Sequence, residues 1–269
     1  MNFWHRNIAA FKLAWIQQLE YRLNLFVDAA LQPSLTAVVE ICLWYVMVAN
    51  IGTGDSLGGF PRIYYLHYAL WACFFARISA NWMYESRMCD EIQSGTVNVI
   101  LTRPLSFFEF YFSQFMSYKI LTSSVSLGIP ILIVSFFLPG PTDLTKLPLA
   151  CASVLFYLTF IYGLSFLVVC SAFKLTRVNA LTVAKNFTIW SLSGELFPID
   201  LAPPAIKTLL LQLPFASGVY LPVGYLTGRI DSAMVYTGML RVAIGLVITS
   251  VLGFVLWRRG LRSYVGTGA

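Results

Sequence analysis

Long apolar runs recur along this sequence and limit what it can fold into. A helix needs about 20 predominantly apolar residues, with a range of about 17–25, to cross the roughly 30 Å hydrocarbon core of a bilayer. Six runs meet this requirement, at residues 23–50, 63–84, 118–138, 147–172, 181–197 and 233–257. A transmembrane β-barrel would show shorter segments of alternating polarity. The chain is therefore predicted to be an all-α polytopic membrane protein, with six transmembrane helices in a single domain over residues 1–269.

The composition excludes a single water-soluble domain. Of the 269 residues, 58% are hydrophobic and 11% are charged, whereas a soluble domain carries roughly 45–50% apolar and about 25% charged residues. Lys and Arg outnumber Asp and Glu by 18 to 12, but these cations flank apolar runs, as the positive-inside rule expects of a membrane protein. We therefore expect membrane lipid as a partner and no nucleic acid.

Residues 1–22 are amphipathic rather than uniformly apolar. Side chains at helical spacing form one apolar stripe, made of Trp4, Ile8, Phe11, Trp15 and Leu19. A helix of this kind lies in the membrane interface. The alternative is that these residues are the first turns of a long first span.

Prolines interrupt the apolar stretch 198–230, at Pro198, Pro203, Pro204, Pro214 and Pro222. Proline lacks the N–H that a continuous helix uses, and broken backbone is tolerated in a membrane only where protein covers it. The stretch therefore predicts short half-helices that re-enter the outer leaflet between the fifth and sixth spans, and not a seventh span.

The distribution of Lys and Arg predicts the orientation. With the N-terminus inside, twelve of these residues fall on the cytosolic side and five on the outer side, with Arg77 inside the second span. Cytosolic loops carry the excess of Lys and Arg. Both termini and the long connection at residues 85–117 are therefore predicted to be cytosolic.

No motif in the sequence indicates catalysis. It contains no G-x-x-x-x-G-K-[ST] phosphate-binding loop and no H-E-x-x-H metal motif. The pair Ser193-Gly194 would need a nearby base to activate the hydroxyl, and His67 lies on a distant span, so a small-residue turn is the simpler interpretation. The five cysteines include no C-x-x-C pair. We expect no enzymatic activity, no metal site and no cofactor in this chain.

Residues 85–106 read ESRMCDEIQSGTVNVILTRPLS, which mixes charged and apolar residues. In a bare loop the charged residues would be solvated, Glu85 included. The apolar residues would not; these are Ile92, Val97, Val99, Ile100 and Leu101. An amphipathic cytosolic helix is therefore predicted, and it must bury its apolar side on the bilayer surface or on a partner protein.

Two motifs resemble those of ABC-2 type exporter permeases. The run IQSGTVNVILTRPL, residues 92–105, is similar to the I-R-S-G-x-[LI]-x-x-x-L-x-R-P pattern that follows the second span in that family, with Gln93 at the Arg position. The run SGELFPIDLAPP, residues 193–204, is similar to the family's S-G-x-x-x-P entry into a proline-broken extracellular region. With the six spans and the amphipathic N-terminus, the resemblance covers nearly the whole chain.

The resemblance implies a half-transporter in a bacterial inner or plasma membrane. Two permeases, identical or homologous, would form the translocation path as a dimer and be driven by separate ABC ATPase subunits, which hold the ATP and Mg. Residues 1–22 would be a connecting helix near the ATPase, residues 85–117 a coupling region docked on it, and residues 198–230 an outer gate. The residues implied for ATPase coupling are Glu91, Ile92, Gln93, Ser94, Gly95, Thr96, Arg103 and Pro104.

Ionisable residues inside a membrane are costly and tend to face a cavity or a partner. Glu40, His67, Glu195 and Arg241 all fall in the outer half of their predicted spans. With Pro198, they are the predicted translocation path or outer gate. The alternative is a set of buried ion pairs and hydrogen bonds that fix helix positions.

Two further charged residues, Asp28 and Lys119, fall near the cytosolic ends of their spans. Long polar side chains at such positions extend along the helix to the polar interface. We therefore expect both to lie at the interface.

Two other functions compete with an ABC permease. An ATP-independent secondary transporter or channel would account for broken helices, but the sequence has one broken region and no second half that repeats the first. A structural membrane subunit without a transport path is the other. Association with an ATPase subunit discriminates among the three.

Overall fold

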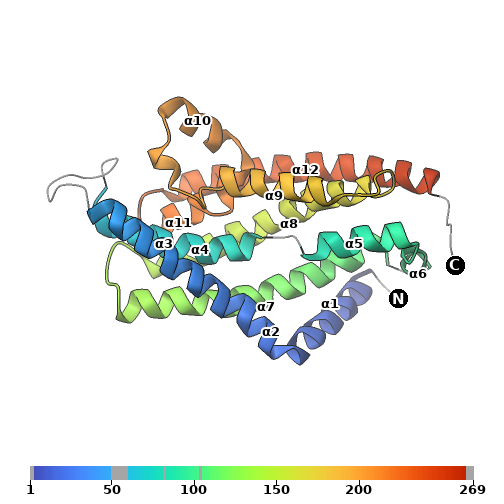
Figure 1. Cartoon of the computed structure of the whole chain (residues 1–269), viewed down its shortest axis with the longest axis horizontal. Coiled ribbons are helices and arrows are strands. Elements are labelled where there is room, and N and C mark those ends of the chain that lie inside the picture. The colour runs from blue at the N-terminus through green and yellow to red at the C-terminus, as the bar shows by residue number, and fades with distance from the viewer. Residues whose placement is uncertain (1–2, 50–59, 81–82, 103–104, 265–269) are drawn as a thin grey trace.

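The computed structural model describes residues 3–49, 60–80, 83–102 and 105–264. Its regular elements are α1 (Phe3–Glu20), α2 (Arg22–Phe26), the π-helical η1 (Val27–Leu31), α3 (Gln32–Ala49), α4 (Arg62–Ser79), α5 (Met83–Ser94), α6 (Val97–Leu101), α7 (Phe107–Phe136), η2 (Leu144–Lys146), α8 (Leu147–Ser171), α9 (Asn179–Leu192), η3 (Ile199–Leu201), α10 (Pro204–Gln212), η4 (Pro214–Ser217), α11 (Tyr220–Leu226) and α12 (Ser232–Ser263). Helix α1 begins and α12 ends at the end of the bundle that carries α5 and α6, while α10 and α11 lie at the opposite end (Figure 1). The chain therefore starts and finishes at one end of the bundle, as it must if both termini lie on one side of a membrane.

Within the described residues, four helical stretches are long and apolar enough to cross a membrane. They are Arg22–Met47 (α2 to α3), Phe107–Phe136 (α7), Leu144–Ser171 (η2 and α8) and Ser232–Ser263 (α12). Helix α4 falls outside this group because it carries Arg62, Arg77 and several tyrosines. Helix α9 has 14 residues, which is about 21 Å at 1.5 Å per residue. The prediction of an all-α membrane protein is confirmed, and the count of six spans stays a prediction that depends on α4 and α9.

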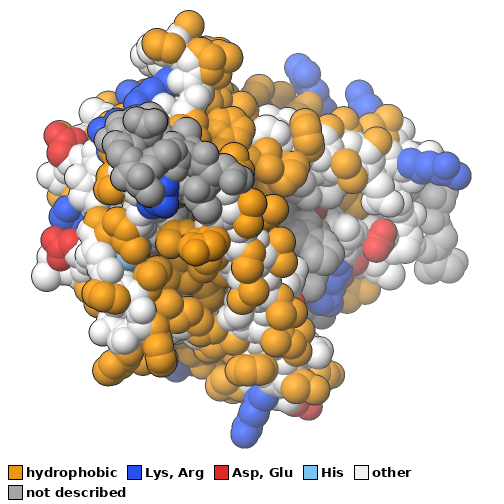
Figure 2. Space-filling view, turned by 60° about the vertical axis from the view of Figure 1, so that its left-hand side comes forward, with side chains coloured by type: hydrophobic (Ala, Val, Ile, Leu, Met, Phe, Trp, Pro, Cys, Tyr) orange, Lys and Arg blue, Asp and Glu red, His pale blue; other side chains and the backbone are white. Residues whose placement is uncertain are grey.

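Much of the molecular surface is hydrophobic, as a surface in contact with lipid must be. Figure 2 shows hydrophobic side chains spread over the visible face, with Lys and Arg side chains toward its margins. On α12, Leu240, Ile244, Val247 and Val251 are each more than half exposed. In water such a stripe would be an aggregation hazard, whereas in a bilayer it is the expected lipid-facing side.

Helix α4 occupies the centre of the bundle and contacts α3, α7, α8 and α11. Its aromatic side chains are fully enclosed, with Tyr65, Trp71 and Phe74 at 0% exposure. Because protein surrounds α4 on several sides, polar groups on it face other helices rather than lipid. This position lets the central helix carry charges that a lipid-facing helix would not tolerate.

The second predicted span, residues 63–84, is shorter in the structure. Helix α4 ends at Ser79, Ala80 has an extended backbone with ψ 135°, and α5 is a separate helix. The Ser79 hydroxyl donates a hydrogen bond to the Gly218 carbonyl at 3.1 Å, which fixes the end of α4 beside η4. The sequence has neither glycine nor proline between Ser79 and α5. The prediction of one helix reaching residue 84 is therefore wrong, and no helix breaker in the sequence marked the boundary.

The fifth predicted span, residues 181–197, also ends early, because α9 stops at Leu192. Gly194 has a φ of +86°, a left-handed conformation that side chains disfavour. Tyr68 donates its hydroxyl to the Gly194 carbonyl at 2.6 Å, so α4 holds this turn in place. Ser193-Gly194 is thus a small-residue turn, as the sequence analysis preferred.

The third span begins earlier than predicted. Helix α7 starts at Phe107 behind a capping box, in which Ser106 Oγ accepts from the Glu109 N–H at 3.2 Å and the Glu109 carboxylate accepts from the Ser106 N–H at 3.0 Å. A capping box satisfies two of the free N–H groups at a helix start. The last part of the predicted 85–117 connection, from residue 107, is therefore continuous with the membrane helix.

Short helices make up the proline-rich stretch 198–230. The longest helix there, α10, has nine residues, and Pro204 and Pro214 each stand in the first turn of a helix, where the missing N–H costs nothing. The chain therefore makes no single helix across this described stretch. Its insertion into the outer leaflet stays a prediction.

Helix α1 packs on α7 and projects away from α2 at a steep angle (Figure 1). Its Asn7 side chain accepts a hydrogen bond from Ser113 Oγ at 3.3 Å, and Ala14 is buried. Two members of the predicted stripe, Ile8 and Leu19, are 49% and 39% exposed, and the Trp4 side chain lies outside the described residues. Helix α1 is thus a separate helix that keeps apolar side chains on its exposed surface.

Candidate functional site

A cavity of about 270 Å³ lies between α3, α4 and α9. Its walls mix polar and apolar side chains, which include Gln32, Thr36, Cys73, Arg77, Asn186, Trp190 and Glu195. Charged and amide groups that open to a cavity inside an apolar bundle mark a path for a polar or amphipathic solute. This cavity is the candidate site.

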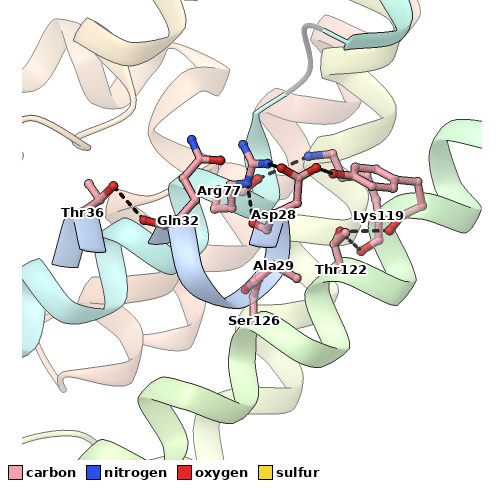
Figure 3. Close-up of polar contacts among 9 residues, drawn as sticks. Asp28, Ala29, Gln32, Thr36, Arg77, Lys119, Thr122 and Ser126 are labelled. Carbon is pink, nitrogen blue, oxygen red and sulfur yellow. Dashed lines mark hydrogen bonds and ion pairs between the residues drawn. The ribbon is translucent and has the colours of Figure 1, made fainter. Parts of the chain in front are cut away.

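Arg77 forms one charged wall of the cavity and is held by Asp28 (Figure 3). Its Nη2 lies 2.8 Å from Asp28 Oδ1, and its Nε donates to the Asp28 backbone carbonyl at 2.9 Å. Tyr118 donates its hydroxyl to the other carboxylate oxygen, Asp28 Oδ2, at 2.7 Å. Two groups of Asp28 on η1 therefore hold the guanidinium, and Tyr118 on α7 holds the carboxylate of Asp28 in turn.

Lys119 brings a second cation to this cluster. Its Nζ donates to the Arg77 backbone carbonyl at 3.3 Å, and the residue is 5% exposed. Asp28 and Lys119 both find partners inside the protein, and their position at the membrane interface stays a prediction. Two cations share one carboxylate, Asp28, so the cluster carries a net positive charge next to the cavity if all three are ionised.

The π-helical turn η1 supplies the backbone carbonyls that hold this cluster. Asp28 O accepts from Arg77, and Ala29 O accepts from Ser126 Oγ of α7 at 2.5 Å (Figure 3). A π turn widens the helix and disturbs its regular hydrogen-bond ladder, and such turns are frequent at functional sites. Here the widened turn joins the first membrane helix to α4 and α7.

Two of the four predicted outer residues, Glu40 and Glu195, lie close together. The Cys73 thiol is within hydrogen-bonding range of the Glu40 carboxylate, and the charge of Glu40 acts on Glu195. Cys73 and Glu195 both line the cavity. Glu195 thus lines the cavity itself, whereas Glu40 lies next to the lining residue Cys73.

The other predicted outer residues lie elsewhere. His67 Nδ1 is 2.7 Å from Thr142 Oγ1 on the loop between α7 and η2, and Pro198 is buried just before η3. Arg241 is half-buried on α12, and its Nη1 has no hydrogen-bond partner among the described residues. None of these three residues lines the cavity.

The predicted coupling residues form the tip of α5 and the turn into α6. Gly95 makes the turn with a φ of +83°. Glu91 pairs with Arg87 one turn earlier at 3.5 Å, and Ser94 and Thr96 share a 2.9 Å hydrogen bond between their hydroxyls. Ser94 and Thr96 are exposed. Arg103 and Pro104 lie outside the described residues.

The apolar side of this segment is mostly buried within the chain itself. Ile92, Val97 and Ile100 are 2%, 0% and 5% exposed, whereas Val99 and Leu101 are 57% and 42% exposed. The prediction that the bilayer or a partner protein covers these residues is wrong for Ile92, Val97 and Ile100, because helices of the same chain cover them.

Sequence reasoning missed a buried ion pair between Glu85 and Lys185. Glu85 was expected to be solvated, yet it is 0% exposed and its Oε2 lies 2.5 Å from Lys185 Nζ. The two residues are one hundred positions apart, so no local pattern links them. A buried carboxylate is tolerated when it is paired and hydrogen-bonded.

A second missed cluster lies at the end of the bundle that carries α10. The Asp200 carboxylate accepts from Lys207 at 2.7 Å and from Arg229 at 3.1 Å, and the Arg229 guanidinium lies 4.0 Å from the centre of the Phe60 ring. Burial would raise the pKa of Asp200, but the hydrogen bonds from both cations outweigh it and hold that pKa below its usual value. The cluster ties η3 and α10 to the α11–α12 turn.

Among the described residues, no group of three or more His, Cys, Asp and Glu side chains could hold a metal ion. The charged residues that line the cavity come from helices that a membrane would enclose.

Comparison with known proteins agrees with this interpretation. Neither a search of curated proteins nor a search of solved structures gives a match. The family model described as ABC-2 family transporter protein matches residues 35–268, which includes most of the cavity lining, α5, α6 and the proline-rich stretch. The resemblance expected from the two sequence motifs is therefore confirmed. The chain belongs to the ABC-2 family of transporter proteins and is a membrane permease of the ABC transporter type.

Proposed function

We propose that this chain is one half of an ATP-driven exporter. Two permeases, identical or homologous, form the translocation path as a dimer, and separately encoded ABC ATPase subunits hold the ATP and Mg that drive it. The observation that carries this proposal is the charged cavity between α3, α4 and α9 in a chain of the ABC-2 family.

The size of the cavity supports a path that two chains share. Its volume of about 270 Å³ is just below the range of about 300–1,000 Å³ for small-molecule sites. On its exposed surface α9 carries Phe187, which is 61% exposed, and α3 carries Leu35, which is 60% exposed. A second permease against these helices enlarges the cavity and separates it from lipid.

The end of the bundle with α5 and α6 is the proposed contact with the ATPase. Ser94 and Thr96 project from it, and α1, the proposed connecting helix, begins at the same end (Figure 1). Of the predicted coupling residues, Gln93, Ser94, Gly95 and Thr96 form the tip, and Arg103 and Pro104 follow it in sequence.

The proposed topology has six spans with both termini in the cytosol of a bacterial cell. Helices α4 and α9 are the second and fifth spans, and the short helices η3 to α11 form an outer gate. The excess of Lys and Arg at the end with the termini supports this orientation. Glu40 and Glu195 then face the outer half of the cavity.

Affinity purification of the permease from its native membranes tests the proposal. We expect an ABC ATPase to co-purify, and a photo-crosslinking residue at Ser94 to capture it. A crosslinker at Thr208 on α10, which is also exposed but lies at the other end of the bundle (Figure 1), is the matched control and should not capture it. A purified permease that lacks any ATPase and still carries solute across liposomes would instead show a secondary transporter or channel.

A further inference from the structure

Helix α5 is attached to α9 by a buried ion pair at its first turn. Lys185 Nζ lies 2.5 Å from Glu85 Oε2, and the two side chains are 6% and 0% exposed. Thr182 Oγ1 donates to the other carboxylate oxygen, Glu85 Oε1, at 2.6 Å. Lys185 Nζ also donates to Ser165 Oγ of α8 at 2.8 Å. Both carboxylate oxygens are therefore occupied by groups on a single helix, α9.

The last turn of α5 is attached to the same part of the chain. Gln93 Nε2 donates to the Leu175 carbonyl at 3.0 Å, in the connection that leads from α8 into α9. Two attachments at opposite ends of a 12-residue helix fix its direction as well as its position. A shift of α5 therefore shifts the start of α9 with it.

The backbone offers α5 no rigid connection to the membrane helix that precedes it. Helix α4 ends at Ser79, and Ala80 is extended, so α4 and α5 are separate helices rather than one rod. Helix α5 instead packs on α8, and the side-chain attachments of Glu85 connect it to α9.

Helix α9 carries such a displacement directly to the cavity. Asn186, the residue that follows Lys185, lines the cavity, and so do Ile189 and Trp190 further along the same helix. A helix of 14 residues is stiff over this length, so the wall that these side chains form moves with its first turn.

We propose that Glu85 and Lys185 are the link through which movement of α5 reshapes the cavity, so that α5 and α9 move as one body. The link rests on the proposed function, because it assumes that a partner ATPase moves α5. Glu85 and Lys185 act as positioning residues and touch no solute.

The accessibility of Asn186→Cys to a small maleimide tests the link without a known substrate. The permease carries no other cysteine, is purified with its ATPase, and is compared without nucleotide and after trapping with ATP, Mg and vanadate. We expect trapping to change the labelling rate at least about fivefold, the lower end of typical coupling between sites. Glu85→Gln should abolish the change, and the exchange Glu85→Lys with Lys185→Glu should restore it.

Lys174→Met is the matched control, because Lys174 is an exposed lysine of the same α8–α9 connection. It should leave the response to ATP unchanged. A second measurement leaves Glu85 and Lys185 unchanged. Spin labels are attached at Asp90 on α5 and at Ala184 on α9, both exposed, and the distance between them should be the same in both nucleotide states.

The outcomes separate the link from the function on which it rests. If no ATPase co-purifies, the proposed function fails and the link fails with it. If the complex hydrolyses ATP but Glu85→Gln leaves the Asn186→Cys response as in the parent, the link alone is overturned. A change in the Asp90–Ala184 separation on ATP trapping also overturns it.

Discussion

Arg77 holds Asp28 by two different groups, its Nη2 at 2.8 Å from the carboxylate and its Nε at 2.9 Å from the backbone carbonyl. The pair joins α4 to the π turn η1 beside the cavity, and Lys119 adds a second cation that only this carboxylate balances. The charge of Asp28 therefore has a larger role than that of an ordinary interfacial residue.

Asp28→Asn should destabilise the protein, because it leaves the partly exposed Arg77 and the buried Lys119 without this counter-charge. Removing one partner of a buried pair costs about 3–5 kcal/mol; with both side chains partly exposed, we expect the lower end of that range, about 3 kcal/mol. The apparent melting temperature in detergent measures the loss. Adding Lys119→Met to Asp28→Asn should recover part of the lost stability, because one unbalanced cation is then removed. If the losses of the two single variants simply add in the double variant, Arg77 and Lys119 do not share the charge of Asp28.

Gly194→Ala should be strongly destabilising. The position has a φ of +86°, and an added Cβ would lie 2.8 Å from Tyr220 Cβ and 2.9 Å from the Tyr68 hydroxyl. Left-handed backbone alone costs a side-chain-bearing residue about 1–2 kcal/mol, and the close contacts add to that. Thermal unfolding in detergent again measures it.

Gly128→Ala on α7 is the control for that substitution, because nothing lies within 4 Å of the added Cβ. Alanine is favoured over glycine in a helix by up to about 1 kcal/mol, so this variant should be as stable as the parent or more so. If Gly194→Ala and Gly128→Ala lowered the melting temperature equally, a side chain at Gly194 would not strain the turn after α9.

Thiol labelling should report the orientation. In intact cells an impermeant maleimide should modify Asp231→Cys, which is exposed at the start of α12, and leave Ser94→Cys unmodified until the cells are opened. The native Cys89 should stay unlabelled in both cases, since burial and the nearby charges of Glu85 and Asp90 raise its pKa to about 12 and keep it a thiol at neutral pH. Labelling of Ser94→Cys alone in intact cells would reverse the proposed topology.

Acid should loosen the cluster around Asp200. The pKa of Asp200 in the folded protein is lowered relative to about 3.9 in an unfolded chain. The ionised carboxylate therefore contributes to stability above the unfolded-state pKa, and this contribution is lost as the pH falls through the folded-state pKa. Asp200→Asn should therefore melt at a lower temperature than the parent at neutral pH, with the difference shrinking below about pH 4. A constant difference from neutral to acid pH would exclude this ionisation as the cause.

Features set by neighbouring residues could be predicted from the sequence, and those set by distant contacts could not. The prolines of residues 198–230 predict the short helices found there, and the Ser106–Glu109 capping box is a local signal for the start of α7. The end of α4 depends on contacts such as that of Ser79 with Gly218, which no breaker residue announces.

The candidate site shows the same division. Glu40 and Glu195 were chosen because ionisable residues in apolar spans are unusual, and the structure brings them together. The same criterion also selected His67 and Arg241, which lie elsewhere, because depth in the membrane says nothing about the direction in which a residue faces. The Glu85–Lys185 pair joins positions one hundred residues apart, so only the folded chain brings the two side chains together.

The π turn at Val27–Leu31 has a consequence for how relatives of this permease diverge. Each helical residue turns the chain by about 100°, so deleting one residue from the widened turn would rotate all of α3 relative to the bundle. Ala37 and Ile41 would then take the places of Thr36 and Glu40, and a polar wall would become apolar without any substitution. A single codon lost or gained at this point would therefore change the chemistry of the cavity wall, and if the cavity is the translocation path proposed above, insertions and deletions around residues 27–31 are where changes in specificity between homologues are to be sought.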